Sequence, residues 1–406
     1  MDIVSAARHD EIRAVYIKTG LFWNSGGLVW VLSCNSATVQ HYIQMTMPSE
    51  SLHTFKIALL GAAGGIGQPL SLLIKSQLHY AVDSGATMIH LAMYDVAAEV
   101  LVGVHADLAH IDTPVRVTAH YPGGDAEHSL GACLADSHLV VCPAGMARKP
   151  GMTRADLFAT NAKIVRSLAR DIAMHCDLAK VYVLIISNPV NSLVPVVVRT
   201  LQECELQCSG IESRVLGVTS LDATRASTFL GEASATAMQE LPRVPVIGGH
   251  SGATILPVFS QCAAADNLSQ QTVRDLVHRV QNGGDEVVKA KNGKGSATLS
   301  MAHCGFRMLS HVSKMLIHGD EETSTIAYVS LKRGDGSAIA PGAAELMVHN
   351  GGLPYFAIPL TLSPSGIVEI KYRIMDYLNY NELNELLPVC LEHLREDIAL
   401  GEQFAL

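Results

Sequence analysis

The residue in this chain best suited to exchange a proton with a ligand is His250. It lies within Gly248-Gly249-His250-Ser251-Gly252, so only small residues flank its ring and a ligand can approach closely. Histidine changes charge near neutral pH, which suits proton exchange with an alcohol. The alternative is a histidine that merely occupies a glycine turn. The cluster therefore predicts an acid–base residue only if other polar groups converge on the ring.

A second cluster, Leu221-Asp222-Ala223-Thr224-Arg225, combines a carboxylate with a guanidinium. Asp222 and Arg225 are three residues apart and share one face of a helix, where a structural ion pair is the simpler interpretation. The two side chains can also act separately. In that case Asp222 orients a histidine, and the planar fork of Arg225 binds a carboxylate through two hydrogen bonds.

Two further clusters each follow an apolar run that predicts a buried strand. Residues 147–154 (ARKPGMTR) bring Arg148 and Arg154 together around a Pro-Gly pair. Such a loop can close over an anion, and a solvated basic loop is the alternative. Residues 187–191 (SNPVN) place Asn188 directly after a strand, where its amide can donate and accept hydrogen bonds. Asn-Pro is also simply a good turn former.

The element that must position these clusters begins with residues 55–69, FKIALLGAAGGIGQP. Their pattern predicts a strand, a tight turn and a helix. Gly61, Gly64 and Gly67 allow the backbone to approach a phosphate, while the first N–H groups of the helix point at the anion. Asp95 ends the next apolar run, where a carboxylate can bind ribose hydroxyls and repel a 2′-phosphate. The stretch therefore predicts a dinucleotide site that favours NAD over NADP.

The order of the predicted elements indicates an α/β fold of the Rossmann type, a doubly wound parallel sheet followed by a mixed α+β domain. We expect an extension over 1–54, a dinucleotide-binding domain over 55–217 and a second, catalytic domain over 218–406. The expected strands are 57–60, 89–94, 115–119, 139–143, 181–186, 244–247, 254–259, 325–331 and 355–362, and the expected helices are one after Gly67 and others over 100–111, 155–174, 220–232, 269–290 and 379–400.

The composition of the 406-residue chain is that of a globular protein, with 49% hydrophobic and 17% charged residues. A net charge of −9 without a basic block argues against nucleic-acid binding, which needs clustered Lys and Arg. The nine cysteines include no CxxC pair, so we expect reduced thiols and no metal site. The most apolar segment, 181–198, is interrupted by Pro189, Pro195 and polar residues, and we expect no membrane span.

Residues 1–54 differ in character from the rest of the chain. Basic residues such as Arg8 ahead of an apolar patch are typical of a targeting peptide, whereas acidic residues such as Asp10 are unusual in one. The alternatives are a disordered segment or a translation start at Met45 or Met47. Reduced thiols indicate an intracellular protein, and the carboxyl end Gln-Phe-Ala-Leu is no peroxisomal signal. We therefore expect a mitochondrial or cytoplasmic location.

Taken in order along the chain, six motifs resemble the signatures of NAD-dependent malate dehydrogenases of the type found in mitochondria and many bacteria. The resemblance extends over about Phe55–Phe404. It leaves out the extension, an insertion near 79–87 and parts of 310–352. It implies NAD as the cofactor, a dicarboxylate substrate and a homodimer. The motifs are GAAGGIG, ARKPGMTR, SNPVN, LDATR, VPVIGGHSG and GSATLSM.

The resemblance also implies a role for each candidate side chain. His250 would accept the hydroxyl proton of malate, and Asp222 would orient the ring and stabilise its imidazolium form. Arg225 would bind the carboxylate next to the reacting carbon, Arg154 would polarise the carbonyl, and Arg148 would pair with the distal carboxylate. The implied cofactor contacts are Gly61, Ala62, Gly64, Gly65, Ile66, Gly67, Asp95, Asn161, Ile186, Asn188 and Met301, with Asn188 also contacting the substrate.

Three alternatives remain open on the sequence alone. One is a 2-hydroxy-acid dehydrogenase of broader specificity, against which Arg148 argues because a buried, unpaired guanidinium disfavours a substrate with one carboxylate. Another is a short-chain dehydrogenase, whose Tyr-x-x-x-Lys spacing is matched by Tyr328 and Lys332. The last is a non-catalytic NAD-binding protein, which the presence of His250 and Asp222 disfavours.

Overall fold

The computed structural model describes residues 17–24, 27–34, 45–46, 53–85, 87–146, 154–204, 210–235, 240–319 and 322–405. The chain divides into two compact units, 1–53 and 54–406. In the first unit β1 (Ile17–Asn24) and β2 (Gly27–Cys34) pair antiparallel, and β3 (Met45–Thr46) pairs with β2. The second unit contains every candidate site residue that the structure describes.

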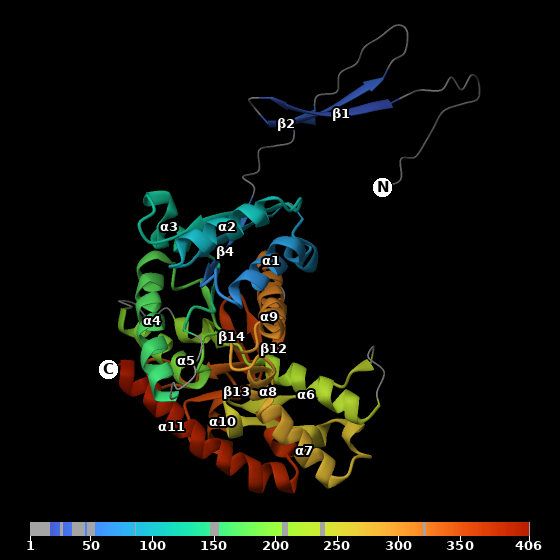
Figure 1. The fold of residues 1–406 in the computed structure, drawn as a ribbon, viewed down its shortest axis with the longest axis vertical. Coiled ribbons are helices and arrows are strands. Elements are labelled where there is room, and N and C mark those ends of the chain that lie inside the picture. The colour runs from blue at the N-terminus through green and yellow to red at the C-terminus, as the bar shows by residue number, and fades with distance from the viewer. Residues whose placement is uncertain are drawn as a thin grey trace, which may run out of the picture. The chain divides into compact units, whose positions relative to one another are not determined.

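One sheet of eleven strands forms the centre of the second unit (Figure 1). Its parallel strands are β4 (Thr54–Leu60), β5 (Met88–Tyr94), β6 (Val115–His120), β7 (Leu139–Cys142), β8 (Tyr182–Ile185) and β9 (Val215–Gly217). They lie in the order β6-β5-β4-β7-β8-β9. The order reverses between β4 and β7, and in such sheets ligands bind beyond the carboxyl ends of the strands at this point.

Helices cover the parallel strands. Those that contact the strands directly are α1 (Gly67–Val82), α2 (Ala98–Ala109), α3 (Leu130–Leu134) and α5 (Val190–Cys204). α4 (Arg154–His175) packs against α3 and α5, and α9 (Leu299–His318) comes from later in the chain. Every residue of β7 and β8 is buried, as expected for strands that helices cover. α9 packs against α1, so the second half of the chain contacts the helix that follows the glycine turn (Figure 1).

The remaining strands continue the same sheet in antiparallel pairing. They are β10 (Val246–Gly248), β11 (Ile255–Pro257), β12 (Thr323–Ser330), β13 (Tyr355–Ser363) and β14 (Gly366–Ile370). β12 pairs with β9 where Tyr328 lies opposite Gly217. One sheet therefore continues from the parallel strands into the antiparallel strands, across the predicted domain boundary at residue 217. The helices of this half are α6 (Ser220–Ala233), α7 (Gln270–Gln281), α8 (Gly283–Ala290), α10 (Ala343–His349) and α11 (Leu387–Ala405).

The predicted Rossmann-type α/β fold is confirmed, but two predicted helices differ from the structure. The helix expected over 269–290 is interrupted at Asn282, between α7 and α8. Glycine disfavours a helix interior, and a Cβ on Gly283 would lie 2.9 Å from Cδ of Arg225, which passes this point. The helix expected from 379 becomes α-helical only at Leu387, after a π-helical turn over Glu382–Leu386.

Four helices of the second unit were missing from the sequence prediction: the short helices α3 and α10, and the longer helices α5 and α9. α5 contains Pro195, which disfavours a helix interior, yet nearly all of its residues are buried and packing outweighs local propensity. α9 begins inside a stretch for which no helix was expected. Its buried Met301, Met308, Leu309 and Val312 recur at helical spacing, so the signal was present in the sequence.

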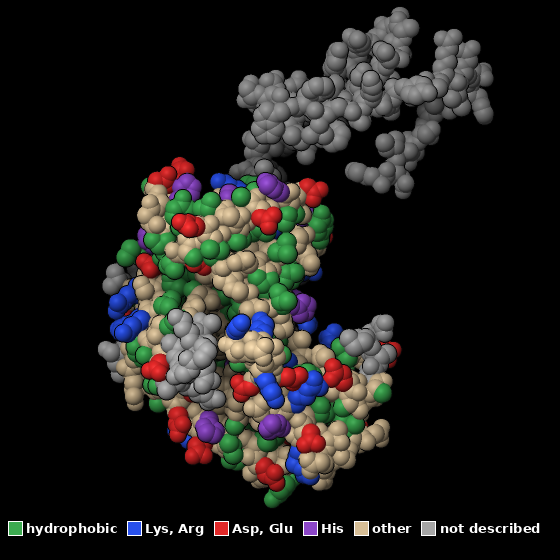
Figure 2. All heavy atoms as spheres, in the orientation of Figure 1, with side chains coloured by type: hydrophobic (Ala, Val, Ile, Leu, Met, Phe, Trp, Pro, Cys, Tyr) green, Lys and Arg blue, Asp and Glu red, His purple; other side chains and the backbone are tan. Residues whose placement is uncertain are grey.

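Charged side chains of both signs are interspersed on the face shown in Figure 2. Across the described ranges of the chain, the helices are all too short or too polar to cross a membrane. The main hydrophobic core includes residues from both the parallel and the antiparallel strands, and a smaller cluster lies between α6 and α7.

Candidate active site

The glycine turn between β4 and α1 lies at the point where the strand order reverses. Gly61 has a φ of +99°, and a Cβ there would lie 2.7 Å from Cα of Ala144, which follows β7. The N–H groups of Gly61 and Ala62 both donate to the carbonyl oxygen of Tyr94, at 2.8 and 3.1 Å. Ile66 ends the turn, directly before α1. The first position of the turn therefore requires glycine, as expected for a backbone that holds a ligand closely.

The rest of the turn leaves its backbone open. Gly64 and Gly65 are exposed, which allows a dinucleotide phosphate to approach the backbone here, and the N–H of Gly64 donates to the carbonyl oxygen of Gly61 at 3.3 Å. Gly67 is the first residue of α1, and a Cβ there would lie 2.6 Å from Cα of Ala62. A Cβ on Gly65 would lie 3.0 Å from Cγ2 of Thr298, so the segment before α9 closes on the turn. These features fit the diphosphate of a dinucleotide.

Asp95 lies directly after β5 and is held at the glycine turn. Its Oδ2 accepts a hydrogen bond from the N–H of Ala63 at 2.9 Å, and its Oδ1 accepts one from the N–H of Ala97 at 2.9 Å. An ionised carboxylate can accept about four hydrogen bonds. Two positions therefore remain for ribose hydroxyls, as the sequence prediction requires.

Asn161 joins the segments that follow β7 and β8. Its side chain is 2% exposed, and its Oδ1 accepts a hydrogen bond from the N–H of Met146 at 2.7 Å. Its Nδ2 donates to the carbonyl oxygens of Met146 at 3.2 Å and Asn188 at 2.7 Å. Asn188 itself is exposed and precedes a cis peptide bond to Pro189. Asn161 thus holds the backbone from which Asn188 would contact a ligand.

Ile186 and Met301, two further predicted cofactor contacts, are 1% and 3% exposed. Met301 lies in the first turn of α9. Ile186 packs against the same helix, because a Cβ on Gly305 would lie 3.1 Å from Cδ1 of Ile186. Their contact with a cofactor remains a prediction.

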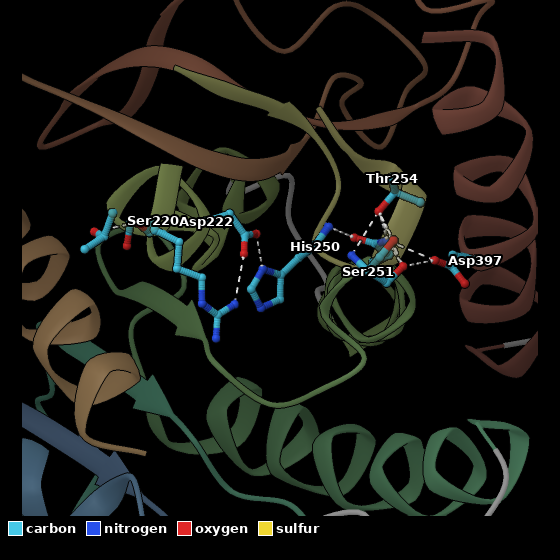
Figure 3. Close-up of polar contacts among 9 residues, drawn as sticks. Ser220, Asp222, His250, Ser251, Thr254 and Asp397 are labelled. Carbon is cyan, nitrogen blue, oxygen red and sulfur yellow. Dashed lines mark hydrogen bonds and ion pairs between the residues drawn. The ribbon is translucent and has the colours of Figure 1, made fainter. Parts of the chain in front are cut away.

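His250 meets Asp222 at the start of α6 (Figure 3), and Arg225, on the same helix, lies on the other side of the Asp222 carboxylate. Oδ2 of Asp222 lies 2.5 Å from Nδ1 of His250, and Oδ1 of Asp222 lies 3.5 Å from Nη1 of Arg225. Asp222 is fully buried, whereas the side chains of His250 and Arg225 are 9% and 12% exposed. Because an ionised carboxylate only accepts hydrogen bonds, Nδ1 of the ring donates and Nε2 keeps its lone pair. Asp222 thus makes both contacts that the sequence left as alternatives, the pair with Arg225 and the hydrogen bond that orients a histidine.

The two arginines of the predicted loop cannot be placed around this centre. Arg148 lies outside the described residues. Arg154 is the first residue of α4, and its side chain is likewise outside the described part of the structure. Their roles remain predictions.

Comparison with known proteins supports the same conclusion as the fold and the site. Residues 55–212 match the lactate/malate dehydrogenase NAD-binding domain, and residues 219–405 match the α/β carboxyl-terminal domain of the same proteins. The chain belongs to the lactate/malate dehydrogenase family.

Relatives in the lactate/malate dehydrogenase family align over most of their length. The cytoplasmic malate dehydrogenase of Saccharomyces cerevisiae is 50% identical over 88% of this chain and 96% of that protein. The mitochondrial malate dehydrogenase of Schizosaccharomyces pombe is 40% identical over 88% of this chain and 93% of that protein. The apo structure of the Picrophilus torridus malate dehydrogenase has a TM-score of 0.65 at 20% identity, covering 86% of this chain and 98% of that one, which shows the shared fold.

Within this lactate/malate dehydrogenase fold, Tyr328 is a core residue. It is fully buried, its hydroxyl donates to the carbonyl oxygen of Asn191 at 3.1 Å, and burial raises its pKa well above the usual value. A tyrosine in this state does not exchange protons with a substrate at neutral pH. The short-chain dehydrogenase alternative, based on Tyr328 and Lys332, is therefore wrong.

Sequence reasoning missed Asn191, the last residue of the SNPVN motif. It is 1% exposed, and its Oδ1 accepts a hydrogen bond from the N–H of His250 at 2.8 Å. The available signal was an amide at the start of a long apolar run, because a buried amide needs partners.

Proposed function

We propose that this chain is an NAD-dependent malate dehydrogenase, which interconverts (S)-malate and oxaloacetate. The observation that supports this most strongly is the hydrogen bond from Nδ1 of His250 to the buried carboxylate of Asp222, with Arg225 beside it. Asp222 and Arg225 follow the carboxyl end of β9, at the same edge of the sheet as the glycine turn, and His250 follows β10. The names of the two yeast relatives support the same substrate.

In malate oxidation His250 accepts the hydroxyl proton at Nε2, because Nδ1 is already bonded to Asp222. The Asp222 carboxylate stabilises the imidazolium that results. Arg225 binds the carboxylate next to the reacting carbon through its two parallel N–H groups. Bound NAD would supply the hydride acceptor for C2 of malate. The glycine turn and Asp95 would hold the diphosphate and the ribose of this dinucleotide.

On the resemblance to malate dehydrogenases, Arg154 polarises the carbonyl of oxaloacetate and Arg148 pairs with the distal carboxylate. Burying an arginine side chain without an anion beside it costs several kcal/mol of free energy. Substrates with one carboxylate are therefore disfavoured. On the same grounds Asn188 contacts both the substrate and the cofactor, and Asn161 and Met301 contribute near the nicotinamide end. Ile186 is a further cofactor contact.

The test is NADH oxidation by the full-length chain with oxaloacetate, pyruvate and phenylpyruvate in parallel. We expect kcat/KM for oxaloacetate to exceed the other two by at least about 10²-fold. His250→Asn should still bind NADH but lose at least about 10²-fold in kcat, the usual contribution of acid–base catalysis. Comparable rates on all three acids would instead support the enzyme of broader specificity. A fully active His250→Asn would contradict the mechanism.

We also propose an extension over 1–54, an NAD-binding domain over 55–217 and a catalytic domain over 218–406, consistent with family matches that end at 212 and resume at 219. The enzyme is proposed to be a homodimer, which light scattering of the purified protein tests. We place it inside the cell, in mitochondria or cytoplasm, which cell fractionation and amino-terminal sequencing of the mature protein distinguish.

A further inference from the structure

A second hydrogen-bonded cluster adjoins His250 through its backbone (Figure 3). Asn191, on α5, accepts the His250 N–H at Oδ1 and donates from Nδ2 to Oδ2 of Asp397 at 2.9 Å. Asp397 lies on α11, 206 residues away in sequence. One buried amide therefore joins the loop of His250 to the carboxyl-terminal helix.

Two hydroxyls complete what we term the Asn191 cluster, which consists of Asn191, Ser251, Thr254 and Asp397. Nδ2 of Asn191 lies 3.0 Å from Oγ of Ser251 and 3.1 Å from Oγ1 of Thr254. Oγ of Ser251 also donates to Oδ2 of Asp397 at 3.0 Å. The two hydrogens of the amide are shared among three acceptors, so every polar atom of the amide has a partner.

The contacts fix the orientation of the Asn191 amide. If the amide were rotated by half a turn, its NH₂ group would face the His250 N–H, and its oxygen would face the Asp397 carboxylate. Both contacts would be repulsive, since donors would face donors and acceptors would face acceptors. The cluster therefore specifies a single arrangement of the loop.

The glycines beside His250 explain why the loop needs this support. A Cβ on Gly249 would lie 2.6 Å from Oγ1 of Thr254 and 2.7 Å from Oδ1 of Asn191, so only glycine lets the amide reach the backbone. Small residues leave the ring open to a substrate, but they provide no side chain that packs the loop in place. The Asn191 amide supplies that restraint.

The backbone of Asn191 is also held. Pro195 has no N–H and cannot make the helical hydrogen bond to the carbonyl oxygen four residues earlier, which belongs to Asn191. The hydroxyl of Tyr328, on β12, donates to this carbonyl instead at 3.1 Å. Asn191 is thus bonded through both its side chain and its backbone, to three elements besides its own helix.

We propose that Asn191 and Asp397 are positioning residues for His250. They hold its peptide group so that Nδ1 meets Asp222 and Nε2 faces the substrate. The inference rests on the proposed malate dehydrogenase activity, in which His250 transfers the proton. Neither residue contacts the reacting atoms.

The first test is Asn191→Asp in the full-length enzyme. The introduced carboxylate faces Asp397 and cannot donate, so the cluster loses its central hydrogen bond. We expect kcat for oxaloacetate reduction to fall by roughly 10- to 100-fold, the range for losing a hydrogen bond to a charged group. The affinity for NADH should stay unchanged, and the kinetic isotope effect with 4-deuterated NADH should rise because the chemical step becomes slower. A purely structural role would lower stability but leave the isotope effect unchanged.

The second test restores the donor on the opposite side. In Asn191→Asp combined with Asp397→Asn, the amide on α11 can donate to the carboxylate on α5, and that carboxylate can still accept the His250 N–H. We expect kcat of the double variant to return to within about fivefold of the parent. Asp397→Asn alone should have a small effect, because its amide oxygen can still accept from Asn191 and Ser251.

Asn350→Asp is the matched control. Asn350 is also fully buried, donates to the carbonyl oxygen of Leu353 at 3.2 Å and accepts its N–H at 3.0 Å, but it lies outside the Asn191 cluster. We expect a lower Tm with the kcat and isotope effect of the parent. If Asn191→Asp does not fold, Asp397→Ala opens the cluster from the half-buried α11 side and should lower kcat several-fold.

The outcomes separate this inference from the proposed function. A parent enzyme without oxaloacetate-dependent turnover would overturn the function itself. An active parent whose Asn191→Asp variant keeps its kcat and isotope effect, or whose double variant is no better than Asn191→Asp, would overturn only the positioning role.

Discussion

Replacing Asp222 by asparagine is the most direct perturbation of the proposed proton transfer. The substitution keeps the shape of the side chain but removes the charge that lies 2.5 Å from Nδ1 of His250. Asparagine can present its oxygen to the ring and keep a neutral hydrogen bond. It can also present its NH₂ group, in which case the ring proton moves to Nε2 and that nitrogen can no longer accept the proton of malate.

The expected loss follows from the burial of Asp222. Losing the charge assistance of one hydrogen bond costs at least about 1.5 kcal/mol. Unit charges about 4 Å apart interact by roughly 4 kcal/mol at an effective dielectric constant of about 20, which sets the upper end. Since about 1.4 kcal/mol corresponds to tenfold in rate, kcat should fall by about 10- to 10³-fold. KM for oxaloacetate should rise as well, because Arg225 loses the partner 3.5 Å from its Nη1.

The assay is NADH oxidation with saturating oxaloacetate, with NADH affinity measured separately by fluorescence titration. Asp125→Asn is the matched control, because Oδ1 of Asp125 lies 2.6 Å from Nδ1 of His128 in a similar pair at the exposed surface. The control should have the kcat of the parent. The reasoning is refuted if Asp222→Asn also stays within about threefold of the parent while it binds NADH normally.

Arg148→Gln should raise activity on pyruvate relative to oxaloacetate, because the distal carboxylate loses its partner; equal ratios in variant and parent would remove Arg148 from this role. Gly61→Ala should lose NADH affinity by at least about tenfold and lower the Tm, because its φ is +99° and its Cβ would meet the backbone of Ala144 at 2.7 Å. Burial, together with neighbouring cations, lowers the pKa of His90 and of His120 to about 4. Below about pH 6.5 the unfolded chain therefore binds more protons than the folded chain, so the free energy of unfolding falls as the pH drops from about 6.5 towards about 4. Replacing both histidines by glutamine should reduce this loss of stability. Urea unfolding at about pH 7 and about pH 5 measures it.

The glycine substitution has a control in helix α2. Gly103 has no atom within 4 Å of the position of a Cβ, so Gly103→Ala should leave NADH affinity unchanged and favour the helix. A loss of affinity in both variants would point to a general effect of the substitutions. An unchanged affinity in Gly61→Ala would show that the turn tolerates a side chain.

The glycine turn and the parallel strands β4 to β8 could be predicted because each depends on residues that are adjacent in sequence, whereas the three-residue parallel strand β9 was missed. The six consecutive apolar residues 181–186 mark a buried strand without reference to the rest of the chain. The types of the catalytic candidates could also be recognised, since Asp222 and Arg225 share one face of a helix. Their meeting with His250 could not be derived from spacing, and it was expected only from the resemblance to malate dehydrogenases.

The support of the site was beyond the sequence patterns, because it depends on contacts between distant segments. The Asn191 amide and the Asp397 carboxylate belong to helices α5 and α11 and are 206 residues apart in sequence, and the residues around neither one indicate the partner. The same reason explains the helix over 190–204, which local propensity disfavours at Pro195 and tertiary packing stabilises. Where contacts between distant segments decide the structure, a single sequence does not show which residues lie close together.

The position of His250 depends on the place where the two halves of the sheet join. Gly217 ends β9 and lies opposite Tyr328, and a Cβ there would lie 2.8 Å from Cγ1 of Val190, so α5 lies directly against the sheet at this glycine. This close approach allows the Tyr328 hydroxyl to reach the carbonyl of Asn191 at 3.1 Å, and the Asn191 amide in turn holds the loop of His250. A change that separates α5 from the sheet should therefore slow proton transfer without touching any residue that contacts the substrate.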